Sequence, residues 1–189
     1  VDLQFSYSQP YVNVVKEKIE PRQSSQSILQ LGYQFPCQYG DKDYFALIVF
    51  NAMFGEFAHS ALFTTLREKE GLAYSISSQF DIFTGLLEVY AGIEKSNRNQ
   101  AMRGISRELN YIKLGRFSSS LLNQTKKIIR MNALLSEDHA LTLVEQRFNE
   151  VIFGDKSLSL ENWIDEIEKI TKKDVCSVAR QVKLQSLFF

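Results

Sequence analysis

Three stretches of the chain alternate hydrophobic and polar residues with the period of two that is typical of half-buried β-strands. A Thr84-Gly85 turn separates the second stretch from the third, so this pair predicts an antiparallel hairpin. The positions that define one face of each stretch are Leu29, Leu31, Tyr33 and Phe35, then Tyr74, Ile76, Ser78, Phe80 and Ile82, then Leu87, Val89, Ala91 and Ile93.

Two further segments predict strands from composition and position. Residues 12–20 are rich in β-branched residues at their start and end at Pro21, which favours an edge strand. We expect the strand over 28–35 to pair with it, because the two are consecutive. Residues 182–189 predict a final strand.

Helical spacing of apolar residues marks the rest of the chain. Residues 44–54 are apolar nearly all round, which predicts a central helix that Asp41 or Asp43 can cap. The helix is interrupted at Gly55 and restarts to end near Arg67. Further helices are expected over 101–112, 121–135 and 141–152, after Ser159, and after a capping box formed by Thr171 and Asp174.

This order of elements predicts an α+β fold, in which helices pack over one face of an antiparallel-type β-sheet. With 189 residues, the chain is the usual size of one domain. We expect residues 12–189 to form this single domain. Residues 1–11 are expected to be a linker or the cut edge of a longer chain, because they are polar and contain Pro10.

Charge and composition exclude several classes of protein. The 22 basic and 22 acidic residues cancel and form no long block of one sign, so nucleic acid is not an expected partner. The longest apolar run is interrupted by Asn51 and is too short to span a membrane. Cys37 and Cys176 lie far apart and form no metal or redox motif, which favours a reduced, cytoplasmic protein.

The joint between the helix that ends near Arg67 and the strand that begins near Tyr74 carries the strongest candidate chemistry. Gly71 lies between them and can adopt the positive φ that ends a helix. Because the connector is short, the guanidinium of Arg67 and the phenol of Tyr74 should lie on one rim. Both donate hydrogen bonds and suit a peptide carbonyl or an oxyanion. The alternative is a surface ion-pair former beside a half-buried aromatic residue.

Metal and nucleophile motifs are absent from the sequence. A zinc-peptidase helix needs two histidines one turn apart, whereas His59 and His139 are the only histidines. Glu56 and His59 imitate half of a metal site without a second histidine, so His59 is interpreted as a capping or surface residue. We therefore expect no metal, no cofactor and no catalytic residue in this domain, and no activity from it alone.

The segment LREKEGLAYSISS, preceded by DYFALIVFNAMFGEFAHSALF, resembles the second domain of the pitrilysin, insulinase and mitochondrial processing peptidase family. The resemblance runs from about Gln26 to the C-terminus, is strongest over 43–94 and is closest to bacterial two-domain members. In that family the first domain carries an H-x-x-E-H zinc motif, and an R-x(6)-Y pattern in the second domain holds substrate. Arg67 and Tyr74 match this pattern, with Gly71 as the supporting turn.

The resemblance implies the inactive half of a zinc metalloendopeptidase. The chain would then close a chamber around a peptide substrate, together with a zinc-bearing peptidase domain or subunit in a dimer. Two alternatives remain open: a structural assembly subunit of the same fold, and a stand-alone module that binds extended peptides at its sheet edge.

Overall fold

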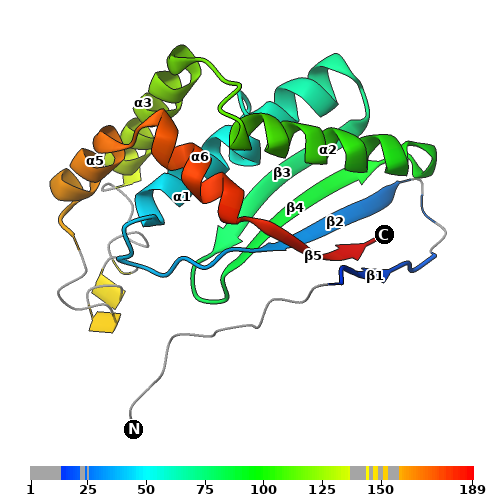
Figure 1. The fold of residues 1–189 in the computed structure, drawn as a ribbon, viewed down its shortest axis with the longest axis horizontal. Coiled ribbons are helices and arrows are strands. Elements are labelled where there is room, and N and C mark those ends of the chain that lie inside the picture. The colour runs from blue at the N-terminus through cyan, green and yellow to red at the C-terminus, as the bar shows by residue number, and fades with distance from the viewer. Residues whose placement is uncertain are drawn as a thin grey trace, which may run out of the picture.

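The computed structural model of the chain describes residues 14–21, 24, 26–136, 144, 147–148, 151–152 and 158–189 (Figure 1). The linker expected over 1–11 and His139 lie outside these residues. The helix expected over 141–152 lies largely outside them, and those of its residues that are described are helical.

A five-stranded sheet with the order β1-β5-β2-β4-β3 forms one layer of the molecule. β1 pairs with β5 in parallel, and the other neighbours are antiparallel. The strands are β1 (Lys16–Lys18), β2 (Ser27–Gln34), β3 (Ala73–Asp81), β4 (Leu86–Ile93) and β5 (Lys183–Phe188).

The expected pairing of the first two strands is wrong, because the C-terminal strand β5 lies between β1 and β2. Local alternation shows that a segment is a strand but carries no information on a partner about 150 residues away. The expectation that the first strand lies at an edge is confirmed.

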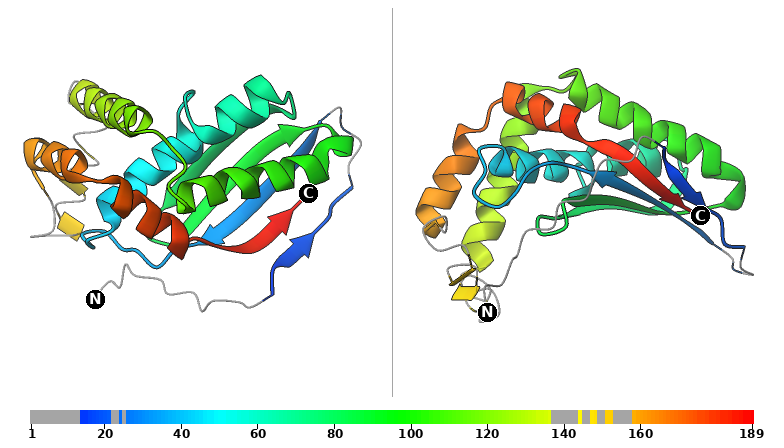
Figure 2. Two further views of the ribbon diagram at one scale, coloured as in Figure 1. Left: turned by 45° about the horizontal axis from the view of Figure 1, so that its top comes forward. Right: turned by 60° about the horizontal axis from the view of Figure 1, so that its bottom comes forward.

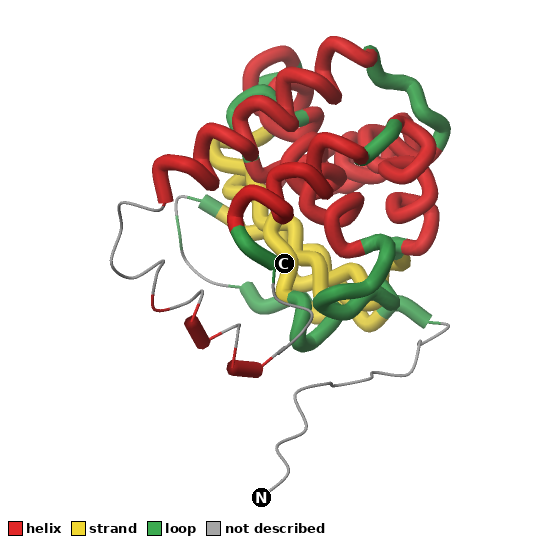
Figure 3. The backbone as a smooth tube through the Cα atoms, turned by 90° about the vertical axis from the view of Figure 1, so that its left-hand side faces the viewer, coloured by secondary structure: helices red, strands yellow, loops and turns green. Residues whose placement is uncertain are grey.

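Helices form the second layer and lie over one face of the sheet (Figure 2). Figure 3 shows the same two layers from the side, with the helices gathered above the strands. This arrangement confirms the predicted α+β fold class. The helical elements with bounds are α1 (Tyr44–Asn51), η1 (Ala52–Glu56), η2 (Phe63–Lys69), η3 (Lys95–Asn97), α2 (Arg98–Lys113), α3 (Ser119–Ser136), α5 (Leu160–Lys169) and α6 (Lys172–Gln181).

The core lies between the layers and is built from the alternating strand positions and the apolar helix faces. Leu29, Leu31, Leu87, Val89 and Ala91 are buried, whereas the intervening Gln30, Glu88 and Tyr90 reach the other face. No helix in the described part of the chain is long and apolar enough to cross a membrane.

The central helix is almost fully buried and continues from α1 into the π-helical turn η1. Asp43 occupies its N-cap position but makes no capping bond there, and its carboxylate instead accepts a hydrogen bond from Gln181. At the other end, a Cβ on Gly55 would lie 2.8 Å from the backbone nitrogen of Ser78. The glycine therefore lets this turn lie directly on β3.

The structure confirms the helix caps and the hairpin turn that short sequence motifs predict. Ser159 caps α5 through a bond from the Asn162 amide, and Thr171 and Asp174 form the predicted capping box of α6. Gly85 has φ 67° in the turn that joins β3 to β4. These features depend on neighbours within a few residues, so the sequence alone predicts them.

Candidate functional site

The joint between η2 and β3 is shaped by Gly71, whose φ of 61° confirms it as the residue that ends the helix. The helix runs to Lys69, two residues beyond the end expected near Arg67. The Leu72 amide then bonds to the Leu66 carbonyl at 2.8 Å, which closes the wide last turn. The chain therefore turns sharply from the helix into β3.

Arg67 lies on the last turn of η2 and is exposed. Its guanidinium lies over the Phe63 ring, 4.6 Å from the ring centroid. In the part of the chain that the structure describes, Arg67 makes no ion pair. Its N–H groups can therefore still bind a carbonyl oxygen or an anion.

Tyr74 lies at the start of β3 with half of its surface exposed. The alternation predicted it on the same face as Ile76 and Ser78, and this prediction is wrong. The pairing with β4 shifts between Ala73 and Ser75, so an extra residue is present there. Such a bulge breaks the period of two, and Ala73 is the buried residue in place of Tyr74.

Glu94 is the partner of Tyr74 that the sequence analysis missed. The Tyr74 hydroxyl donates to Glu94 Oε1 at 2.7 Å, across the open end of the hairpin. This bond to a carboxylate raises the pKa of Tyr74, so the phenol keeps its proton and remains a donor. The predicted hairpin brings the two segments together, but only its register identifies Glu94.

Helix α2 braces the joint from the side. Glu70 and Arg107 form an ion pair at 2.6 Å, and Arg107 also contacts Glu108 at 3.0 Å. Gly104 lets the two helices approach, because a Cβ there would lie 3.2 Å from Leu66. The joint is therefore a supported part of the fold rather than a free loop.

His59 does not cap a helix. Its Nε2 lies 2.9 Å from Thr125 Oγ1, and the Thr125 hydroxyl donates to the Leu121 carbonyl. The imidazole Nε2–H must therefore donate to Thr125, which links the segment before η2 to α3.

Within the described ranges, no group of three or more His, Cys, Asp and Glu residues could hold a metal ion. Cys37 and Cys176 are both buried free thiols.

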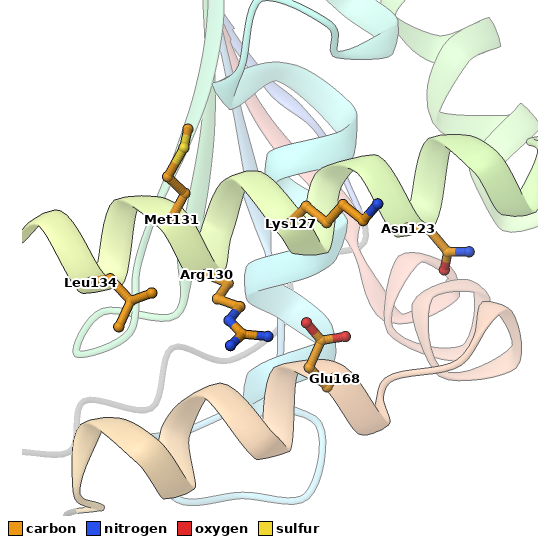
Figure 4. Close-up of a pocket in the computed structure, with 6 residues that line it drawn as sticks. All are labelled: Asn123, Lys127, Arg130, Met131, Leu134 and Glu168. Atoms are coloured by element: carbon orange, nitrogen blue, oxygen red, sulfur yellow. The ribbon is translucent and has the colours of Figure 1, made fainter.

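A separate hollow of about 390 Å³ lies between α3 and α5 (Figure 4). Arg130 and Glu168 point toward each other across it, and Met131 and Leu134 extend the wall along α3. No element of the joint contributes to its lining. It is therefore not part of the candidate site.

Comparison with known proteins identifies a family match and close relatives. The family described as "Peptidase M16 inactive domain" matches residues 3–129. The "Probable inactive metalloprotease YmfF" of Bacillus subtilis is 37% identical over 174 residues, which are 92% of this chain and 41% of that protein. The "Uncharacterized zinc protease YmxG" of the same organism is 27% identical over 164 residues, 85% of this chain and 40% of that protein.

Solved structures share the fold. A conserved protein from Enterococcus faecalis superposes with a TM-score of 0.94 at 40% identity, over 97% of this chain and 43% of that chain. An M16 inactive domain from Pseudomonas fluorescens has a TM-score of 0.72 at 17% identity, over 92% and 42% of the two chains. This chain spans about two-fifths of the length of the relatives it matches.

Proposed function

The chain belongs to the family of peptidase M16 inactive domains, and we propose that it clamps an extended peptide substrate for a zinc metallopeptidase. In this proposal the chain forms the wall of the substrate chamber that binds no metal. The zinc lies on a partner domain or subunit, which completes a dimer-like enclosure. The relatives named as zinc proteases, which are more than twice as long as this chain, support such a partner.

The observation that carries the proposal is the placement of two exposed donors at the ends of one braced joint. Arg67 donates to a backbone carbonyl of the peptide, since its guanidinium is free of ion pairs within the described residues. Tyr74 donates to the oxyanion that develops on the attacked carbonyl. Gly71 orients both side chains toward the peptide, because its left-handed backbone sets the angle of the turn between them.

Glu94 adds a condition to this scheme. The Tyr74 hydroxyl is already donated to a carboxylate at 2.7 Å, so a substrate oxygen must replace Glu94 as acceptor. A developing oxyanion competes with a carboxylate better than a neutral carbonyl does. The exchange would therefore favour the transition state over the bound substrate.

The test is peptide hydrolysis by the full-length protein with a zinc-bearing partner, for wild type, Arg67→Ala and Tyr74→Phe. Each substitution should lower kcat/KM roughly 10²- to 10³-fold if the side chain binds the reacting carbonyl. Arg103→Ala and Tyr111→Phe on α2 are matched controls, because neither side chain takes part in the contacts of α2 with Glu70 and Leu66, and they should leave turnover unchanged. A loss under tenfold at Arg67 and Tyr74, with assembly intact, contradicts the clamp.

A second candidate is a structural assembly subunit without proteolysis. It is favoured by the likeness to a relative that is itself named an inactive metalloprotease. Under this candidate the protein still assembles with its partner, and Arg67→Ala and Tyr74→Phe change neither assembly nor any peptidase activity of the complex.

We also propose a cytoplasmic location, which both free thiols support.

A further inference from the structure

The face of the sheet opposite the helices is organised in rows that run across the strands. One row is Lys16, Ser186, Gly32, Glu88 and Gln79, each paired with the next in the strand register. Neighbouring strands lie about 4.8 Å apart, so Lys16 and Glu88 are separated by roughly 14 Å at the backbone. Between them stand only a serine and a glycine.

These small residues leave a hollow of about 360 Å³, which we call the Glu88 hollow. Gly32 is essential to its depth, because even a Cβ at this position would lie 2.4 Å from Ser186 Oγ. Its lining includes Lys16, Lys18, Phe188 and Glu88 in addition to the small residues. It can hold a side chain that lies across the sheet.

The Glu88 carboxylate is held in place without a cation. Gln30 Nε2 donates to one oxygen and Gln79 Nε2 to the other, both at 3.2 Å. No lysine or arginine pairs with it among the residues that the structure describes. Each oxygen keeps a further acceptor site, so a ligand cation could bind without displacing either amide.

The other charges of the hollow are separated from Glu88. Glu17 is engaged by Arg98, and Lys18 lies beside the Phe188 ring, 5.9 Å from its centroid. Lys16 and Lys18 belong to β1, three strands away from β4 in the sheet order. The hollow is therefore negative at its β4 end and positive at its β1 end.

We infer that the Glu88 hollow is a subsite for a lysine or arginine side chain of the peptide substrate. The inference rests on the proposed function for its premise that the ligand is a peptide. Glu94, the partner of Tyr74, follows Glu88 by six residues along β4 and beyond its end. At about 3.3 Å per residue this is ~20 Å. A bound extended peptide would thus place its basic residue about six positions from the carbonyl held at Tyr74.

Equilibrium binding tests this subsite without any need for turnover. The probes are fluorescent 15-residue extended peptides that are identical except for a central Lys, Gln or Glu, titrated into the full-length protein. Wild type should bind the Lys peptide about fivefold more tightly than the Gln peptide, as expected for an accessible ion pair, and the preference should weaken in high salt. The Glu peptide should bind most weakly.

Substitutions assign the preference to one side chain. Glu88→Gln should remove the preference for the Lys peptide, and Glu88→Lys should reverse it in favour of the Glu peptide. Glu161→Gln removes the same charge from exposed α5 and should change nothing. If Glu88→Gln does not fold, Glu88→Lys alone assigns the preference, and an unreversed preference in that variant overturns the subsite.

The outcomes separate the subsite from the clamp. Equal affinity of wild type for the three peptides, or an unchanged preference in Glu88→Gln, overturns the subsite and leaves the clamp intact. Binding of none of the peptides, together with no effect of Arg67→Ala on hydrolysis, removes the proposed function as well.

Discussion

The hydroxyl of Tyr74 donates to Glu94 Oε1 at 2.7 Å, and this bond joins the first residues of β3 to the residue that follows β4. It fixes the position of a phenol that is otherwise half exposed. It also makes the protonation of the Tyr74 phenol depend on one carboxylate, that of Glu94.

The titration of Tyr74 should therefore respond to Glu94. The bond to the Glu94 carboxylate, with a contribution from its charge, raises the pKa of Tyr74 above its ordinary value of 10.0. Glu94→Gln keeps an acceptor oxygen but removes the charge, so we expect the pKa of Tyr74 to fall. NMR of ring-labelled tyrosine measures this, with Tyr74→Phe to assign the signal. An unchanged titration would show that the bond does not persist in solution.

Gly71 should contribute to stability through its backbone alone. Its φ is 61°, and a Cβ there would meet nothing within 4 Å, so strain is the main cost of a side chain. Gly71→Ala should lower the free energy of unfolding by about 1–2 kcal/mol. Gly71→Asn should cost less, because asparagine tolerates left-handed backbone better. Urea denaturation compares the two, and equal losses would argue against this conformation at the joint.

The sequence predicts those features of the joint that depend only on residues close to them in the chain. Gly71 as the helix end and the hairpin that follows are both local patterns, and both are confirmed. The exposed position of Tyr74 was not predictable, because a bulge at Ala73–Ser75 depends on the register of the opposite strand. The same register brings Glu94 to Tyr74.

In the rest of the fold, too, the sequence predicts the local features but not those that depend on distant residues. The α+β class and the caps at Ser159 and Thr171 follow from periodicity and short motifs. The insertion of β5 between β1 and β2 is a long-range pairing, which only the competition among all strands decides. The π-helical turns η1 and η2 also escape prediction, because they depend on how closely the helices pack on β3.

Gly55 should tolerate no side chain. An added Cβ would lie 2.8 Å from the backbone nitrogen of Ser78, which cannot move without distorting β3. Gly55→Ala should therefore lower the free energy of unfolding by about 1–3 kcal/mol or more. Gly104→Ala is the matched comparison and should cost less, because its Cβ would press only on side-chain atoms of Leu66 at 3.2 Å or more, and alanine favours the helix over glycine. A smaller loss at Gly55 than at Gly104, measured by urea denaturation, would contradict the close approach.

His59 should make stability depend on pH on the acid side of neutrality. Burial lowers the pKa of His59 below its ordinary value of 6.5, so the folded state resists a proton that the unfolded chain accepts. The unfolded state then binds more protons as the pH falls through 6.5, and the free energy of unfolding must decline over that range. Above this value the imidazole is neutral in both states, and the contribution is constant.

His59→Gln is the variant that isolates this effect. A glutamine amide can still donate to Thr125 Oγ1, which His59 Nε2 approaches at 2.9 Å, but it does not titrate. The difference in free energy of unfolding between wild type and His59→Gln should therefore shift against wild type between pH 7.5 and pH 5. Urea denaturation at the two pH values measures it. A difference that stays constant would mean that His59 titrates alike in the folded and unfolded chains, and that its contact with α3 does not shield it from water.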